Sequence, residues 1–299
     1  MIEYYKNSPV PEAKFSILIP TWNNLPFVEL CVKSIRQNST FEHQIILHIN
    51  DGSDGTLAWA KAQGVDYSLS AANVGICLAC NAAASLATTD YILYINDDMY
   101  VCPEWDLRLW GKITDYGRTD FYFSGTMIER TPNNWGCTST PHDYGSSPND
   151  FRETDLLKDY KTLAITDWRG ANYPPSIMHR SYWALIGGFS VEFSPGMYSD
   201  PDICRKLWDV GVRNFRGVGD SLVYHFMSKS IGRVKRNDGR AQFMHKWKMS
   251  SHTFMKHYLG LSSGSEGFDY QGLATEPANT LQFKITKAID RVKSLLSFI

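Results

Sequence analysis

"DYILYINDD", at residues 90–98, joins an apolar run to two adjacent carboxylates. The apolar part, residues 91–94, predicts a buried strand, and Asn96, Asp97 and Asp98 follow its end. Carboxylates beside a buried strand are costly unless another group compensates their charge. The stretch therefore predicts a strand end that holds a partner of opposite charge.

Strands and helices are expected to alternate on the N-terminal side of this stretch. Apolar runs predict strands at 15–20, 43–51 and 65–70. Helical spacing and composition predict helices at 25–39, 55–64 and 73–89. This alternation is typical of a doubly wound α/β sheet, in which ligands bind at the carboxyl ends of the strands.

Polar side chains follow three of the predicted strands. Thr21 and Asn23 follow the first, Asn50 and Asp51 follow the second, and the carboxylate pair follows the last. One such tail is usually a turn or a helix cap. Three tails at one edge of one sheet favour a polar site.

The C-terminal side of the chain adds fewer signals. The texture becomes irregular between about 120 and 175, and residues 129–151 are rich in Pro, Gly, Asn and Ser. A helix is predicted at 199–212, where Asp200 and Asp202 act either as capping acids or as a general base. A strand is predicted to end at His225, which is either a metal ligand or simply hydrogen-bonded.

The composition excludes several classes of protein. A net charge of -1 over 299 residues argues against a nucleic-acid partner. No apolar run approaches the ~20 residues of a membrane span, and the N-terminus has no signal-peptide pattern. Six scattered cysteines, with one C-x-x-C at 77–80, indicate buried thiols in a reducing cytosol rather than a zinc site. We therefore expect a cytoplasmic protein.

The aspartate pair suits a hard divalent cation. Mg²⁺ and Mn²⁺ take oxygen ligands and commonly bridge protein carboxylates to a diphosphate. The metal stabilises the charge that develops on the diphosphate as it leaves.

Six motifs, in order along the chain, resemble those of family-2-type glycosyltransferases with the GT-A fold. These motifs are "SILIPTWNN", "ILHINDGSDGT", "NVGICLACNAA", "YINDDMYVCPEWD", "GGFSVEFSPGMYSDPDICRKLWDVGVR" and "SLVYHF". Together they run from residue 15 to about 226. The resemblance implies a Rossmann-like, mostly parallel central sheet flanked by helices, with a C-terminal helical extension.

The resemblance also implies how the chain is divided. Residues 1–227 would form the catalytic domain, with a nucleotide-binding half at 15–110 and an acceptor and catalytic half at 111–227. Residues 228–280 would form a basic lid and helical extension, and 281–299 an amphipathic helix.

The implied donor site lies mainly in the first half of the chain. Its residues would be Pro20, Thr21, Asn23, Asp51, Asn73, Asn96 and Asp97. Asp51 would bind the base, Asn73 would lie beside the nucleoside, and Asn96 and Asp97 would face the ribose and the phosphates.

The remaining implied roles concern metal and catalysis. Asp98 would be the main protein ligand of Mn²⁺ or Mg²⁺, and His225 would reach the same metal or the diphosphate. Asp200 would take the proton from an acceptor hydroxyl that attacks the anomeric carbon, which implies inversion. The expected function is metal-dependent transfer from a nucleoside-diphosphate sugar to a saccharide or lipid-linked saccharide, in bacterial surface polysaccharide biosynthesis.

Three positions depart from the family pattern. Cys80 stands where Arg is frequent, Ser199 where Glu is usual, and Asn96 where the first Asp of the metal motif is expected. They leave open an inactive nucleotide-sugar-binding module. A sugar-1-phosphate nucleotidyltransferase fits less well, since "PTWNNLPF" is neither Gly-rich nor basic.

Three further segments have two interpretations each. Arg233, in the basic stretch 228–248, belongs either to a lid over the diphosphate or to a solvated loop. Trp168, with Tyr173, is either an acceptor platform or core, and Tyr198 is placed with the acceptor site.

The tail, 281–299, has an apolar stripe and flanking cations. The stripe is Ile285, Ile289, Val292, Leu296 and Ile299, and the cations are Lys284, Lys287, Arg291 and Lys293. Such a helix suits an anionic membrane surface, here the inner face, or packs on the domain or a second subunit.

Overall fold

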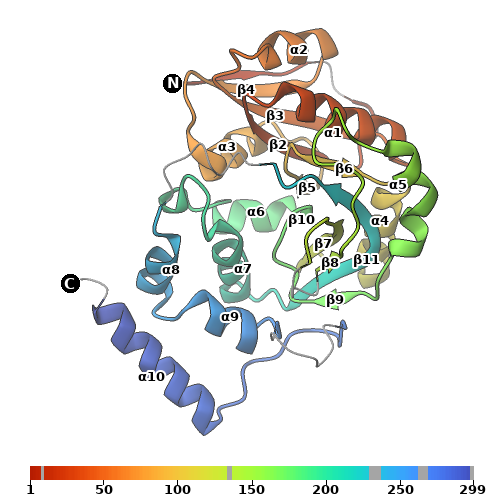
Figure 1. Ribbon diagram of the computed structural model, residues 1–299. Helices are drawn as coiled ribbons and strands as arrows, with labels where there is room; N and C mark the ends of the chain where they lie inside the picture. Colours follow the sequence, from red (N-terminus) through yellow and green to blue (C-terminus); the bar gives the residue numbers. More distant parts are fainter. Residues whose placement is uncertain (8–9, 133–136, 229–236, 262–268, 297–299) are drawn as a thin grey trace.

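The structure is a computed structural model that describes residues 1–7, 10–132, 137–228, 237–261 and 269–296. A continuous mixed sheet runs through the molecule, with helices packed around it (Figure 1). Its strand order is β1-β4-β3-β2-β5-β10-β7-β11-β6, and β8 and β9 pair with β7 and β11. The predicted α/β class, with a central sheet flanked by helices, is confirmed.

The first half of the sheet has the parallel order that the sequence predicts. It contains β2 (Ser16–Trp22), β3 (Gln44–Asn50), β4 (Asp66–Ser70) and β5 (Tyr91–Tyr94), with β1 (Ile2–Tyr5) antiparallel at the edge. The connecting helices are α1 (Leu25–Asn38), α2 (Thr56–Gln63) and α3 (Gly75–Ala84). The carboxyl ends of β2, β3 and β5 therefore meet at one edge of the sheet.

Local sequence explains these helices. Pro26 lies in the first turn of α1, where a missing N–H costs nothing, and Val28, Val32 and Ile35 form its buried face. Gly64 ends α2 in the left-handed conformation, with φ of 62°.

The second half of the sheet mixes directions. It contains β6 (Met99–Val101), β7 (Phe121–Ile128), β8 (Thr138–Ser139), β9 (Trp168–Arg169), β10 (Ser176–His179) and β11 (Asn214–His225). β10 runs antiparallel to both β5 and β7, whereas β11 is parallel to β7 and antiparallel to β6. The expected parallel order is thus confined to the first half.

Helices of this half cover the sheet and lead into the site. They are α4 (Trp105–Tyr116), α5 (Glu153–Asp159), α6 (Arg180–Ile186) and α7 (Ser199–Asp209), with short 3₁₀ helices η1 (Tyr160–Leu163) and η2 (Val191–Phe193). α7 has the predicted Pro201 in its first turn, and Gly211 follows its end.

β7 contradicts the expectation of irregular structure from about residue 120. All eight of its residues are buried, and it lies between β10 and β11. Its apolar run was overlooked because the Pro- and Gly-rich stretch begins directly after it.

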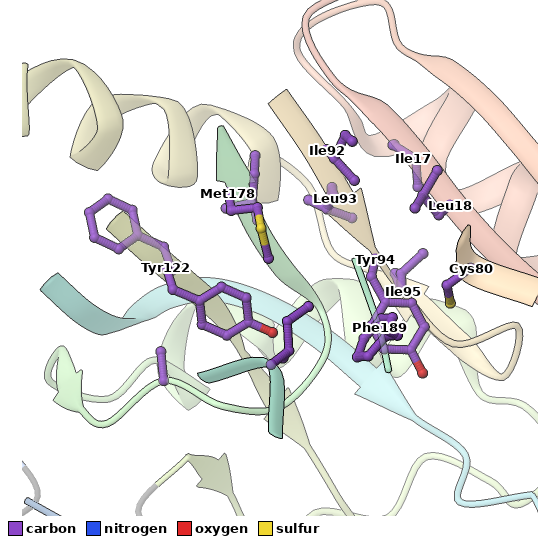
Figure 2. Close-up of a cluster of buried hydrophobic side chains, with 14 of the residues drawn as sticks. Ile17, Leu18, Cys80, Ile92, Leu93, Tyr94, Ile95, Tyr122, Met178 and Phe189 are labelled. Atoms are coloured by element: carbon purple, nitrogen blue, oxygen red, sulfur yellow. The ribbon is translucent and has the colours of Figure 1, made fainter. Parts of the chain in front are cut away.

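The core continues through the junction of the two halves. Ile92 to Ile95 of the β5 region lie between Ile17 and Leu18 on one side and Tyr122 and Met178 on the other (Figure 2). Tyr94 meets Phe189 edge-on, with ring centroids 5.5 Å apart. This core fixes the strand end that carries the aspartate pair.

A helical extension lies at one end of the molecule (Figure 1). It consists of α8 (Gly239–Trp247), α9 (Ser251–His257) and α10 (Leu281–Leu296), with α10 at the margin. Among the described residues, no helix has the length and apolar character needed to cross a membrane.

Candidate active site

A cavity of about 740 Å³ opens at the carboxyl edge of the sheet, a size typical of small-molecule sites. Three strand ends and the start of α7 line it. Its polar lining includes Thr21, Asn50, Asn73, Asn96, Asp97, Asp98, Glu129, Tyr198, Asp200 and His225, and Pro20 also lies in the wall. The structure thus brings together most of the residues that the sequence singled out.

Asp98 and His225 lie side by side in this cavity. His225, at the end of β11, places Nε2 3.6 Å from Oδ1 of Asp98. The backbone N–H of Ser228 donates to Oδ2 of Asp98 at 2.7 Å. Glu129, which follows β7, contacts the other side of the ring, with Oε1 2.7 Å from Nδ1 of His225. Glu129 was not predicted, because it begins the irregular stretch and no local pattern distinguishes it.

The two carboxylates control the charge of the ring between them. Burial alone would lower the pKa of His225, but Asp98 and Glu129 outweigh this effect and raise it to about 10. Burial likewise opposes ionisation of Asp98, but the charge and hydrogen bond of His225 hold its pKa below the ordinary value. The cluster is therefore a carboxylate–imidazolium–carboxylate chain.

The donor chemistry of this cluster fits a divalent cation. Asp98 supplies carboxylate oxygens, and His225 supplies a nitrogen once it is neutral, both of them ligands for Mn²⁺. Among the described residues, no three acidic, histidine or cysteine side chains form a complete metal cage. Two protein ligands suffice where a diphosphate completes the coordination, as is usual for Mg²⁺.

Asp200 differs from its neighbour Asp202 in every relevant respect. Asp200 is half-buried and lines the cavity, and no described residue donates a hydrogen bond to it. Burial raises its pKa to about 7. Asp202 is fully buried and accepts hydrogen bonds from Ser190 and Trp247. Of the two candidates, Asp200 is available for chemistry, and Asp202 has a structural role.

The residues that precede Asp98 are held by neighbours. Asn96 accepts a hydrogen bond from the Tyr94 hydroxyl at 2.7 Å. Asp97 accepts one from Asn24 Nδ2 at 3.1 Å. Both line the cavity, as predicted for donor contacts.

Asn23 and Asp51 do not line the cavity. They lie beside it, joined by a hydrogen bond of 2.9 Å from Asn23 Nδ2 to Asp51 Oδ2, and Asp51 is exposed. Their contact with a nucleotide stays a prediction. Asn50 takes the inner position instead: it donates to the carbonyl of Thr21 and accepts from the N–H of Val74. The sequence placed Asn50 in the polar tail but not in the site.

The backbone around the site is strained. Asn23, Asp51, Tyr198 and Met227 have φ of 46°, 67°, 69° and 56°, which non-glycine residues rarely adopt. Such conformations concentrate at functional sites, where the surrounding fold enforces them.

The prediction that Trp168 binds the acceptor is wrong. Its ring is 1% exposed and donates a hydrogen bond from Nε1 to Thr126 at 3.0 Å. Gly217 on the paired strand leaves room for the indole, since a Cβ there would lie 1.8 Å from it. Tyr198 and Tyr173, in contrast, line the cavity.

The remaining predicted positions have simple outcomes. Arg233 lies outside the described residues, as does most of the proposed lid. Cys80 is fully buried and does not line the cavity, and all six cysteines are buried free thiols. The hydroxyl of Ser199 donates to the carbonyl of Gly196 at 2.6 Å, so it braces the loop before α7.

Solved structures of TarS from S. aureus have a similar fold. TarS 1-349 in complex with UDP matches with a TM-score of 0.54 and 13% identity, over 84% of this chain and 67% of that one. The complex with UDP-GlcNAc gives a TM-score of 0.54 and 15% identity, over 78% and 65%. Another TarS 1-349 structure gives a TM-score of 0.51 at 14% identity, over 71% of this chain, which spans only 60% of that structure.

The sequence comparisons give a family. A search of the curated proteins found no match. The family described as glycosyl transferase family 2 matches residues 16–173, which is more than half of the chain. The protein therefore belongs to glycosyl transferase family 2 and is a glycosyltransferase.

Proposed function

We propose that the protein moves a sugar from a nucleoside-diphosphate donor to a hydroxyl group, with inversion and with a divalent metal. One observation carries this proposal: a single cavity holds Asp200, a carboxylate without a hydrogen-bond partner among the described residues, and the Asp98–His225 pair. The first supplies a base, and the second supplies ligands for the metal that binds a diphosphate.

The donor class is supported by the neighbours. The titles of two structures with this fold record complexes of TarS with UDP and with UDP-GlcNAc. At 13–15% identity they support the fold, and the choice of base and sugar for this chain rests on experiment. Pro20, Thr21, Asn73, Asn96 and Asp97 are the residues of this chain that we assign to the donor.

In the proposed reaction, Asp98 and His225 hold Mn²⁺ or Mg²⁺, which neutralises charge on the diphosphate. The acceptor oxygen attacks the anomeric carbon, and its proton passes to the carboxylate of Asp200. The bond from the anomeric carbon to the diphosphate oxygen breaks, and the nucleoside diphosphate leaves. One displacement by one base inverts the anomeric carbon.

The acceptor is proposed to enter beside Tyr198 and Tyr173. Aromatic faces at the cavity suit a sugar ring, and both tyrosines line it. We propose a saccharide or lipid-linked saccharide acceptor, in bacterial surface polysaccharide biosynthesis in the cytoplasm.

Thermal unfolding with UDP, GDP, dTDP and CMP conjugates, with and without Mn²⁺, tests donor binding. A ligand that binds only the folded state raises the melting temperature. We expect one nucleotide class to raise it, and more so with Mn²⁺. If no conjugate shifts the midpoint, the donor proposal fails.

Donor turnover with Mn²⁺ tests catalysis. Asp200→Asn should lower turnover by on the order of 10²–10⁴-fold while nucleotide binding persists. Asp209→Asn is the matched control, because Asp209 lies on the same helix and pairs with Arg205 outside the cavity. No turnover by the unmodified protein, with intact binding, would favour the inactive module that Asn96 and Ser199 leave open.

A further inference from the structure

The placement of α10 reverses the usual orientation of an amphipathic helix on a folded domain. Its buried side chains include Asp290 and Ser294, which are 4% and 1% exposed, together with Phe283. Its apolar side chains face outward: Leu281, Ile285, Ile289, Val292 and Leu295 are between 47% and 74% exposed. Packing on its own domain therefore does not explain the apolar stripe.

Specific contacts hold α10 by its polar face. Oδ2 of Asp290 accepts hydrogen bonds from the N–H and hydroxyl of Ser250, at 2.8 and 3.2 Å. Phe283 packs against His257 and Tyr258 of the α9 region, with ring centroids 5.0 and 6.1 Å away. These contacts fix which face of α10 points away from the protein.

The outward face has the charge pattern of a membrane-surface helix. At 100° per residue, the exposed apolar side chains cover one arc of α10, centred opposite Asp290 and Phe283. Lys284 and Arg291 lie on one flank of this arc, and Lys293 on the other. Asp290 is the only acid between residues 281 and 296, and it is buried. The exposed face thus combines apolar residues with cations alone.

We propose that α10 docks the protein on an anionic lipid surface, with its apolar arc in the interface and its lysine and arginine side chains at the headgroups. Charge favours this occupant over a second copy of the chain, because two such faces would bring cations against cations. This proposal goes beyond the sugar transfer and does not depend on it.

The connection to the cavity gives docking a consequence. α9 packs against α10, and its Ser251 and Met255 line the cavity. Docking through α10 would therefore set the cavity at a fixed position relative to the surface, as a membrane-borne acceptor requires.

Flotation of the full chain with vesicles tests the proposal. Phosphatidylcholine vesicles that contain phosphatidylglycerol should carry the protein upward, and pure phosphatidylcholine vesicles should carry much less. Ile285→Gln combined with Val292→Gln should reduce the floated fraction at least ~10-fold, because both side chains are exposed on the arc. Val191→Gln, an exposed apolar residue elsewhere, should change nothing.

Two readouts make the outcome decisive. Soluble-donor turnover should be unchanged in the Ile285/Val292 double variant, so loss of flotation is separate from failure of the enzymatic proposal. Absence of flotation in the unmodified chain would overturn the proposal. So would a dimer in analytical ultracentrifugation that the double variant dissolves while flotation persists.

Discussion

Asp200 is the residue on which the proposed chemistry depends. Its carboxyl group has a pKa of about 7 because burial in the cavity disfavours the charged form. A base must be deprotonated to act, so transfer should rise with pH through about 7. A pH profile of the transfer rate at saturating donor tests this, and a profile that is flat between pH 5 and about 8 would contradict it.

The same shift predicts a change in stability. The raised pKa means that the folded state binds the proton more tightly, so ionisation of Asp200 removes stability as the pH rises from about 4 through 7. Asp200→Asn should therefore raise the free energy of unfolding at pH 8 by about 1 kcal/mol. At a pH below the unfolded-state pKa, the variant and the parent should unfold alike.

Glu129 acts on the metal through another residue. Its carboxylate contacts Nδ1 of His225 at 2.7 Å and so directs Nε2 toward Asp98. Glu129→Gln should weaken Mn²⁺ binding by about 10-fold or more, as measured by titration calorimetry. Glu153→Gln, which affects an ion pair with Lys33 outside the cavity, is the control. Equal Mn²⁺ affinity in both variants would remove Glu129 from the site.

Local sequence could not separate Asp200 from Asp202. Both open a helix, and both suit its positive end. Only the partners of Asp202, which come from residues 190 and 247, show which of the two is held and which faces the cavity. Trp168 is similar, since its burial depends on a glycine 49 positions away.

At the scale of elements, α8 is tied to α7 by one lysine. Nζ of Lys246 lies 2.9 Å from Oδ1 of Asp202 and 2.8 Å from Oε1 of Glu192. Lys246→Met would leave the buried carboxylate of Asp202 without its charge partner. We expect a loss of about 2–3 kcal/mol in the free energy of unfolding and faster hydrogen exchange in α8.

Lys33→Met provides the comparison for this prediction. Its ion pair with Glu153 is largely exposed, so its loss should cost less than about 1 kcal/mol. Similar costs for the two variants would mean that Lys246 does not hold α8 in place.

Elements with strong local patterns were predictable. The apolar runs of β2, β3 and β5 and the Gly-terminated α2 all appeared where the sequence placed them. β7 did not, because its boundary adjoins an irregular stretch, and the antiparallel β10 has no local signal of its direction. Strand direction depends on contacts between distant segments, which a single sequence does not reveal.

At the scale of the whole molecule, the two halves of the sheet share one core. β5 pairs with both β2 and β10, and one apolar cluster contains Ile17, Leu93, Phe123 and Val223. Residues 15–110 and 111–227 should therefore not unfold separately. Urea unfolding followed by far-UV and near-UV circular dichroism should give coincident transitions for this region. A stable proteolytic fragment ending near residue 110 would contradict this expectation.

The left-handed backbone at the cavity rim bears on how the enzyme can evolve. Tyr198 and Met227 each occupy a conformation that costs most residues about 1 kcal/mol relative to glycine. Selection for heat resistance alone would favour glycine at both positions, and it would remove the side chains that shape the cavity. The rim is thus where adaptation toward durability and adaptation toward a particular substrate would conflict.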